Sequence, residues 1–485
     1  MPHPHNGPER PLVPERPLPP IIQGGMGAGV SDWRLARAVA QEGQMGVVSG
    51  TALDTVLARR LQQGDPGGHL RRALAAFPWP HVAEAYLSTH LIPGGKAPDV
   101  PYRLLPMPTI PLPRERVEAL IVANYCEVWL AKEGHEGPVG INYLEKIQLP
   151  NLPSLLGAML AGVDYVLMGG GIPLAIPGVL ERLARWEPVE MSIHVEGLPA
   201  EHADLARQRL DPREVLPGAP PALVRPRFLA IVSSDVVAKT MLRRGSGMVD
   251  GFVVEDYTAG GHNAPPRRRA APGEAPAFGE ADVPRIEAIR ALERPFWLAG
   301  SCASPERLRE ARAQGAAGVQ VGTAFGLCEE SAIAPAYKRA TLARWRSGEH
   351  AVMTDFRASP TGYPFKVACL PGTLADPALA AARERICDLG YLRECYWRED
   401  GRLGYRCPSE PRAAYLAKGG APERVEGSQC LCNGLMGTIG LAQARPGGEE
   451  LALVTSGEDL GFLAHLAPDG AAGYTAADVV RYLLG

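Results

Sequence analysis

Short apolar runs alternate with amphipathic stretches along the first 345 residues of the chain. The runs are rich in Val, Ile, Leu and Phe, as is typical of strands buried on both faces of a parallel sheet. The amphipathic stretches place apolar residues three and four positions apart, which predicts helices. Eight strands are predicted, at 21–23, 46–49, 139–143, 165–168, 228–232, 252–254, 296–299 and 319–321.

Helices are predicted after these strands, and Ser234 or Asp235 is a suitable N-cap for one of them. Eight strand–helix repeats predict an α/β chain with a (β/α)8 (TIM) barrel, and an open doubly wound sheet is the alternative. Residues 191–195 are expected to form a hairpin or edge element. The other predicted helices are 32–42, 53–63, 114–132, 154–161, 284–292, 305–314 and one near Leu180.

The expected organisation has three parts. Residues 1–20 form a disordered, proline-rich tail, and residues 21–345 form the barrel, with a long insertion after the second strand at 76–137. Residues 346–485 form a C-terminal extension that we expect to be mostly helical.

Glycines follow most of the predicted strands. In a barrel these strand ends meet on one face, where ligands bind. The sixth strand leads into Gly260, Gly261 and His262, which would present a proton-exchanging side chain beside an open backbone. A glycine turn with an exposed histidine is the simpler interpretation. The glycines are Gly24, Gly50, Gly169, Gly260, Gly300 and Gly322.

The loops after strands seven and eight are suited to bind a phosphate group. Gly300, Ser301 and Ser304 lie in one loop, and Gly322 and Thr323 lie in the other. Barrels commonly bind phosphate there, through backbone N–H groups and a helix N-terminus. The alternative is that the glycines only allow tight turns after the strands and that Ser304 is an ordinary helix N-cap. The first unit, QGGMGAGVS, has the wrong spacing for a dinucleotide fingerprint.

Several ordered motifs together resemble the nitronate monooxygenase (2-nitropropane dioxygenase) family of FMN-dependent barrels, which includes an enoyl-[acyl-carrier-protein] reductase branch. They are IIQGGMG, VGINYL, AGGH, LAGS, VQVGTAF and TDFRASPTGYPFK, spread over residues 21–366. The resemblance implies bound FMN and a catalytic His262. The predicted cofactor-binding residues are Gly24, Gly25, Met26, Asn142, Glu255, Gly260, Gly261, Gly300, Ser301, Gly322 and Thr323.

The resemblance implies oxidation of nitronates or nitroalkanes by O2 to carbonyl compounds and nitrite. The enzyme alternative is an NAD(P)H-dependent enoyl reductase that acts on carrier-bound acyl chains. The other alternative is a barrel that binds a phosphorylated ligand without turnover. The chain departs from the family pattern in four places: AGSC replaces AGGI, NAPPRRR follows His262, the insertion at 76–137 is long, and the extension is long.

Other charged and thiol residues allow two interpretations each. Arg267–Arg269 form either a solvated charge run or an anion clamp over the mouth of the barrel. Glu255 and Asp256 would orient His262, bind the ribityl chain or only make the loop polar. Cys302 is either redox-active or a small buried residue. A zinc site at Cys395, Cys407, Cys430 and Cys432 does not fit common spacings, so no metal is predicted.

Composition and charge narrow the cellular setting. The 485 residues carry a net charge of −3, which gives no reason to expect nucleic acid or a membrane surface as a partner. No apolar run is long enough to cross a bilayer, and the N-terminus lacks a signal-peptide core. We expect a cytoplasmic enzyme with reduced cysteines and a small-molecule substrate, and a homodimer is possible.

Overall fold

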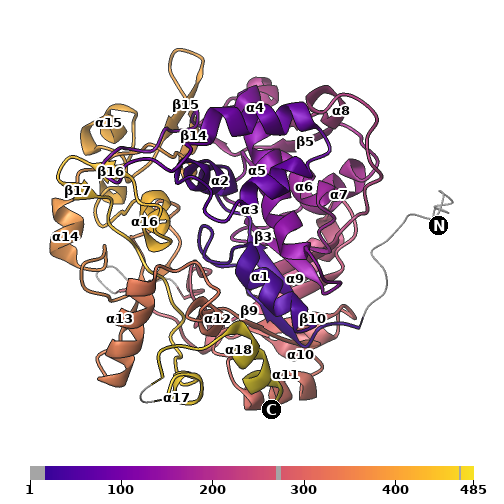
Figure 1. Ribbon diagram of the computed structural model, residues 1–485, viewed down its shortest axis with the longest axis vertical. Coiled ribbons are helices and arrows are strands. Elements are labelled where there is room, and N and C mark those ends of the chain that lie inside the picture. Colours follow the sequence, from indigo (N-terminus) through magenta and orange to yellow (C-terminus); the bar gives the residue numbers. More distant parts are fainter. Residues whose placement is uncertain (1–16, 269–274, 469–470) are drawn as a thin grey trace.

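A computed structural model describes residues 17–268, 275–468 and 471–485 (Figure 1). The predicted tail at 1–20 therefore lies outside the described residues, except for its last four. Eight parallel strands form one sheet in the order β1-β11-β10-β9-β8-β4-β3-β2. These strands are β1 (Ile21–Gln23), β2 (Gly46–Ser49), β3 (Val139–Leu144), β4 (Tyr165–Gly169), β8 (Arg227–Val232), β9 (Gly251–Glu255), β10 (Phe296–Ala299) and β11 (Gly318–Val321).

The two ends of this sheet meet, which closes it into a barrel. Ile22 of β1 forms a parallel bridge with Met45, next to β2. The Gln23 N–H donates to the Met45 carbonyl at 2.9 Å, and the Met45 N–H donates to the Ile21 carbonyl at 3.1 Å. The predicted (β/α)8 barrel is therefore confirmed, and the open sheet is excluded.

Side chains alternate between the inside of the barrel and the helix layer. Val253 of β9 packs inside with Trp297, while its neighbours Phe252 and Val254 pack outward. The Trp297 indole N–H donates to the Pro19 carbonyl at 2.8 Å, so the segment before β1 is fixed to the barrel interior. This two-residue period decides which side chains point toward the axis at the other end of the strands.

The helix layer contains α5 (Arg114–Lys132), which packs against both α1 (Trp33–Gln41) and α6 (Asn151–Leu160). Helix α5 lies within the stretch predicted as an insertion, and its bounds match the predicted helix. Residues 191–195 overlap β5 (Val189–Ser192), which pairs antiparallel with β7 (Arg207–Leu210). The remaining helices before β11 are α2 (Leu53–Gln62), α3 (His69–Ala75), α4 (Pro80–His90), α7 (Ile176–Leu183), α8 (Pro212–Val215), α9 (Asp235–Arg244), α10 (Ile286–Arg290) and α11 (Pro305–Ala313).

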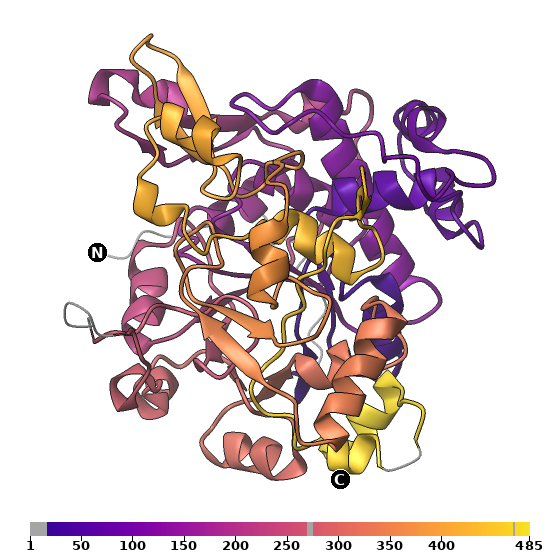
Figure 2. The same ribbon diagram turned by 90° about the vertical axis from the view of Figure 1, so that its left-hand side faces the viewer.

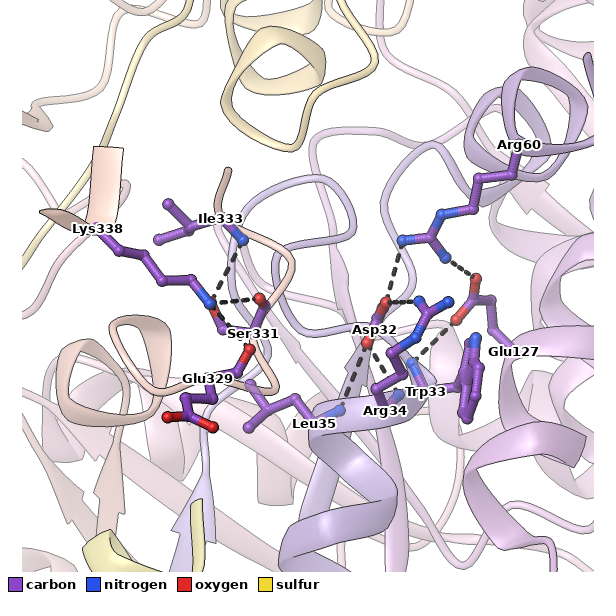
Figure 3. A network of polar contacts seen from close by, with 10 residues as sticks. All are labelled: Asp32, Trp33, Arg34, Leu35, Arg60, Glu127, Glu329, Ser331, Ile333 and Lys338. Carbon is purple, nitrogen blue, oxygen red and sulfur yellow. Dashed lines mark hydrogen bonds and ion pairs between the residues drawn. The ribbon is translucent and has the colours of Figure 1, made fainter. Parts of the chain in front are cut away.

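Arg60 of α2 joins α1 and α5 (Figure 3). Its guanidinium lies 3.1 Å from the Asp32 carboxylate and 2.8 Å from that of Glu127. Asp32 caps α1 by accepting from the Arg34 N–H, and Glu127 accepts from the Trp33 N–H. Burial raises the pKa of Glu127, while the charge of Arg60 opposes that rise. The network fixes the start of α1 beside the mouth of the barrel.

The chain beyond β11 builds a cover over the carboxyl ends of the strands (Figure 2). It contains helices and three antiparallel strand pairs, and β14 also pairs with β6 (Val195–Glu196). Its helices are α12 (Thr323–Gly326), α13 (Pro335–Arg346), α14 (Pro377–Ala382), α15 (Arg412–Ala417), α16 (Leu431–Thr438), α17 (Leu463–Leu466) and α18 (Ala476–Leu484). Its strands are β12 (Val352–Asp355), β13 (Phe365–Ala368), β14 (Glu394–Trp397), β15 (Leu403–Arg406), β16 (Ala444–Arg445) and β17 (Gly448–Glu449).

Helix α18 returns from this cover to the helix layer and packs against α1 and α11 (Figure 1). Val479, Val480 and Leu483 are its buried face. Residues 346–485 are thus part of the barrel's helix layer as well as of the cover, because α18 covers the barrel wall between α1 and α11.

Helix α13 is fixed to the barrel through Lys338. The Lys338 ammonium donates to the carbonyls of Cys328 at 2.6 Å and Ser331 at 2.7 Å. The Ser331 hydroxyl in turn accepts from the Ile333 N–H at 3.3 Å (Figure 3). These contacts hold Ile333 at the wall of the cavity described below. Within the described ranges, no helix is both long and apolar enough to span a lipid bilayer.

Candidate active site

A cavity of about 240 Å³ lies at the carboxyl ends of the barrel strands, beneath the C-terminal cover. Its lining comes from the loops after several strands and from residues beyond position 320. All twelve residues predicted from the sequence line it. They are Gly24, Gly25, Met26, Asn142, Glu255, Gly260, Gly261, His262, Gly300, Ser301, Gly322 and Thr323.

The floor of the cavity is made by inward-facing residues near the strand ends. Asn142 and Gln320 occupy inward positions, and each has a buried side-chain oxygen without a hydrogen-bond partner. The Thr258 hydroxyl, near Gly300 in the cavity lining, also has no hydrogen-bond partner. Because a buried polar atom without a partner is costly, three of them around one cavity indicate a polar ligand.

Gly25 allows the backbone to lie directly over this floor. A Cβ atom at Gly25 would lie 2.4 Å from the Cβ of Asn142, so no larger residue fits. Gly24, Gly25 and Met26 all line the cavity, so this close approach is part of its wall.

The loops after the neighbouring strands β10 and β11 lie side by side at the edge of the cavity. Gly300 and Ser301 both have positive φ, +101° and +46°, which turns the loop sharply after β10. The Thr323 hydroxyl accepts from the Gly457 N–H at 2.8 Å, so its own proton remains available to an acceptor. Since the first N–H groups of α12 also lack an intrahelical acceptor, this group of donors is suited to an anion such as phosphate.

The Gly-Gly-His loop is held by the chain beyond the barrel. The Gly261 N–H donates to the Thr455 hydroxyl at 2.9 Å, and the Lys366 N–H donates to the Gly261 carbonyl at 2.9 Å. His262 itself forms an antiparallel bridge with Phe365 of β13. The cover therefore positions the histidine as well as enclosing it.

His262 has a hydrogen-bond partner that the sequence did not reveal. Its Nε2 lies 2.7 Å from the Ser359 hydroxyl, which also contacts the Thr361 hydroxyl at 2.7 Å. The Phe365 ring meets the imidazole edge-on, with centroids 4.8 Å apart. Ser359 lies within the predicted motif TDFRASPTGYPFK, but no spacing rule connects that motif to His262.

The imidazole is neutral over the physiological range. Burial, together with the charge of Lys146, lowers the pKa of His262 to about 3. Lys146 is itself buried, which lowers its pKa to about 6, and its ammonium lies over the Tyr363 ring. A neutral imidazole is a hydrogen-bond donor and only a weak base.

Glu255 at the end of β9 is a second titratable group on the floor. Burial, with a smaller contribution from Asp256, raises the pKa of Glu255 to about 8. Asp256 instead points to its own loop, where its carboxylate accepts from the Thr258 N–H at 2.9 Å. Ser359 therefore orients His262, and Glu255 is available to the cavity as a neutral carboxyl group.

The other candidates from the sequence contribute less. Burial raises the pKa of the Cys302 thiol to about 12, which disfavours a redox role. Arg267 donates to the Ser233 carbonyl, and neither Arg267 nor Arg268 lines the cavity, while Arg269 lies outside the described residues. All nine cysteines are free, and the described ranges contain no group of three His, Cys, Asp or Glu residues placed to hold a metal.

The apolar wall of the cavity was not predicted. Leu144 and Ile147 from the barrel face residues from the cover, among them Tyr391, Leu392 and Leu435. No single motif marks these positions, because they are brought together only by the tertiary packing of the chain beyond β11.

Residues 227–358 match the family Nitronate monooxygenase, while no curated protein matches the chain. The nitroalkane oxidase of Streptomyces ansochromogenes is similar at 16% identity over 96% of this chain and 94% of that one, with a TM-score of 0.45. FabK from Thermotoga maritima is 18% identical over 73% of this chain and 72% of FabK, with a TM-score of 0.36. The enoyl reductase domain of MlnA from Bacillus amyloliquefaciens is 12% identical over 96% of this chain and 93% of that domain, with a TM-score of 0.44. The match over 227–358, which contains β8 to β11 and His262, confirms the resemblance to the nitronate monooxygenase family and indicates an oxidoreductase.

Proposed function

We propose that the chain is an FMN-dependent oxidoreductase of the nitronate monooxygenase type. It would oxidise nitronates or nitroalkanes with O2 to carbonyl compounds and nitrite. The observation that carries the proposal is the meeting, in one cavity, of His262 with the glycine loops after β1, β10 and β11. The matched segment 227–358 contributes His262 and the loop after β10 to that cavity.

The residues present fit an FMN molecule. The side-chain oxygens of Asn142 and Gln320 have no hydrogen-bond partner and can accept hydrogen bonds from a heteroaromatic ring, and the backbone of Gly25 lies against Asn142 beside them. The loops at Gly300–Ser301 and Gly322–Thr323 would hold its phosphate. FMN, when bound, would accept electrons from the substrate and pass them to dioxygen. FMN is favoured over FAD because the chain offers one phosphate cradle and no dinucleotide fingerprint.

His262 would bind the substrate's oxygens. The Ser359 hydroxyl fixes the ring through Nε2, and the low pKa keeps the ring uncharged. A neutral imidazole donates a hydrogen bond to a nitro or nitronate oxygen but removes a carbon-bound proton poorly. We therefore expect the preformed nitronate anion to be a better substrate than the neutral nitroalkane.

The test is the spectrum and turnover of the purified protein. Yellow protein with heat-releasable FMN, and nitrite formation from propyl-2-nitronate, would support the proposal. FAD, or no flavin after reconstitution, would contradict it. Comparing the nitronate with 2-nitropropane at the same pH measures whether His262 acts as a base.

The apolar wall favours a second candidate, reduction of an enoyl group on an acyl chain with NAD(P)H. Leu144, Ile147 and Leu435 suit a hydrocarbon better than a small polar anion. The two activities separate under anaerobic conditions. Rapid bleaching of the flavin by NADPH favours enoyl reduction, whereas bleaching only by the nitronate favours nitronate oxidation.

A further inference from the structure

The cavity has an apolar half that the chemistry of the flavin and His262 does not use. Six residues form it: Leu144, Ile147, Tyr391, Leu392, Leu431 and Leu435. Leu144 is the last residue of β3 and Ile147 follows it, and the other four belong to the cover. Since apolar linings bind apolar groups, this half would receive the part of a substrate that does not react.

Tyr391 differs from the other five because its position is fixed by a polar cluster behind the wall. Its hydroxyl donates to the Asp54 carboxylate and lies 2.7 Å from the Thr55 hydroxyl. Burial raises the pKa of Tyr391 well above its ordinary value, so the hydroxyl remains a donor. The Tyr391 hydroxyl thus has its hydrogen-bond partners behind the cavity wall, and the ring faces the cavity.

An ion pair supports this anchor. The Arg116 guanidinium lies 2.7 Å from the Asp54 carboxylate, and the two side chains are 2% and 0% exposed. The guanidinium also stands over the Tyr391 ring, 5.1 Å from its centroid, and donates to the Pro106 carbonyl at 2.6 Å. Removing one member of a buried pair is strongly destabilising, so this arrangement resists displacement.

We propose that Tyr391 is a specificity-determining residue that sets how long a hydrocarbon chain the cavity accepts. The inference deepens the proposed function and rests on it for the identity of the reacting end. The rigid ring would act as a stop for the chain, whereas Leu392 and Leu435 would line its path.

The test uses unbranched alkanoates from butanoate to dodecanoate, whose carboxylate is an unreactive analogue of a nitronate. Dissociation constants are measured by calorimetry on the purified protein, and flavin content is measured separately by absorbance. In the wild type we expect affinity to rise about fourfold per methylene and then level off at a limiting length. In Tyr391→Ala the rise should continue to longer chains, with flavin content unchanged.

Tyr102→Leu is the matched control, because Tyr102 belongs to the same apolar cluster but does not line the cavity. It should leave the limiting length where it is. If Tyr391→Ala does not fold, Tyr391→Leu provides the same test with less volume lost. A limiting length that does not move in a folded Tyr391 variant, or wild-type affinity that is independent of chain length, overturns the inference. Flavin-free protein with the expected profile would instead overturn only the proposed function.

Discussion

The Nε2 atom of His262 lies 2.7 Å from the Ser359 hydroxyl, although the two residues are 97 positions apart in the sequence. The histidine comes from the barrel and the serine from the chain that covers it. The proposed catalytic group is therefore oriented only when the cover is in place, so the cover is part of the active site and not an accessory to it.

This relationship predicts that Ser359→Ala lowers turnover without loss of flavin. The imidazole would lose a hydrogen bond worth about 1 kcal/mol, and kcat should fall roughly fivefold. The measurement is nitrite release from a nitronate under saturating O2. Thr361→Val is a comparison variant, because Thr361 contacts Ser359 but not the imidazole. Equal kcat values for Ser359→Ala and the wild type would show that Ser359 does not orient His262.

Replacing His262 by Ala should lower kcat/KM by a similar factor on a neutral nitroalkane and on its nitronate. The neutral imidazole removes a carbon-bound proton poorly, so the variant loses mainly a hydrogen bond to the nitro or nitronate oxygens, which costs roughly tenfold. Both kcat/KM values are measured on protein with equal flavin content. Unchanged activity on both substrates would mean that His262 is not catalytic.

Lys146→Met should shift the acid limb of activity upward in pH. Below about pH 6 the Lys146 ammonium is charged and disfavours a second charge on His262. Without that charge the pKa of His262 rises from about 3, although burial still holds it below its ordinary value. The check is a profile of kcat/KM from about pH 2.5 to 7, which includes the pKa of about 3 in the wild type. An acid limb at the same pH in both proteins would exclude coupling between the two groups.

Gly322→Asp should abolish flavin retention. A Cβ atom at Gly322 would make only ordinary contact with Met26, at 3.6 Å from its sulfur, so the fold should tolerate the change. The new carboxylate would face the phosphate and repel it. Gly322→Asn is the isosteric neutral control and should retain more flavin, as measured by absorbance after gel filtration. Equal retention by both variants would place the phosphate elsewhere.

Relative to the wild type, Glu255→Gln should increase the free energy of unfolding more at pH 8 than at pH 4. The folded-state pKa of Glu255 is raised to about 8, so its contribution to stability is fully present below the unfolded pKa near 4.5 and is lost as pH rises through 8. A neutral amide lacks this loss. Urea denaturation at the two pH values gives the difference, and a difference of the opposite sign would mean that Glu255 is ionised in the folded protein.

The barrel was predictable because each strand carries its signal locally. A run such as Phe252–Val254, bounded by glycine and acid residues, needs no distant partner to be recognised as buried. The cavity lining was also predictable, since Asn142 lies within such a strand and Gly260 lies in the loop after another. In the cover, by contrast, β14 exists because it pairs with Val195–Glu196, some 200 positions earlier. Ser359 and Tyr391 were missed because their roles depend on this kind of distant packing.

The return of α18 to the wall between α1 and α11 has a consequence for how the protein is made. On the ribosome, the apolar surface that Val479, Val480 and Leu483 cover stays open to water until the residues of the cover and then α18 have emerged. The nascent barrel therefore cannot complete its outer layer ahead of its cover. Completion of the helix layer and covering of the cavity therefore become one late event.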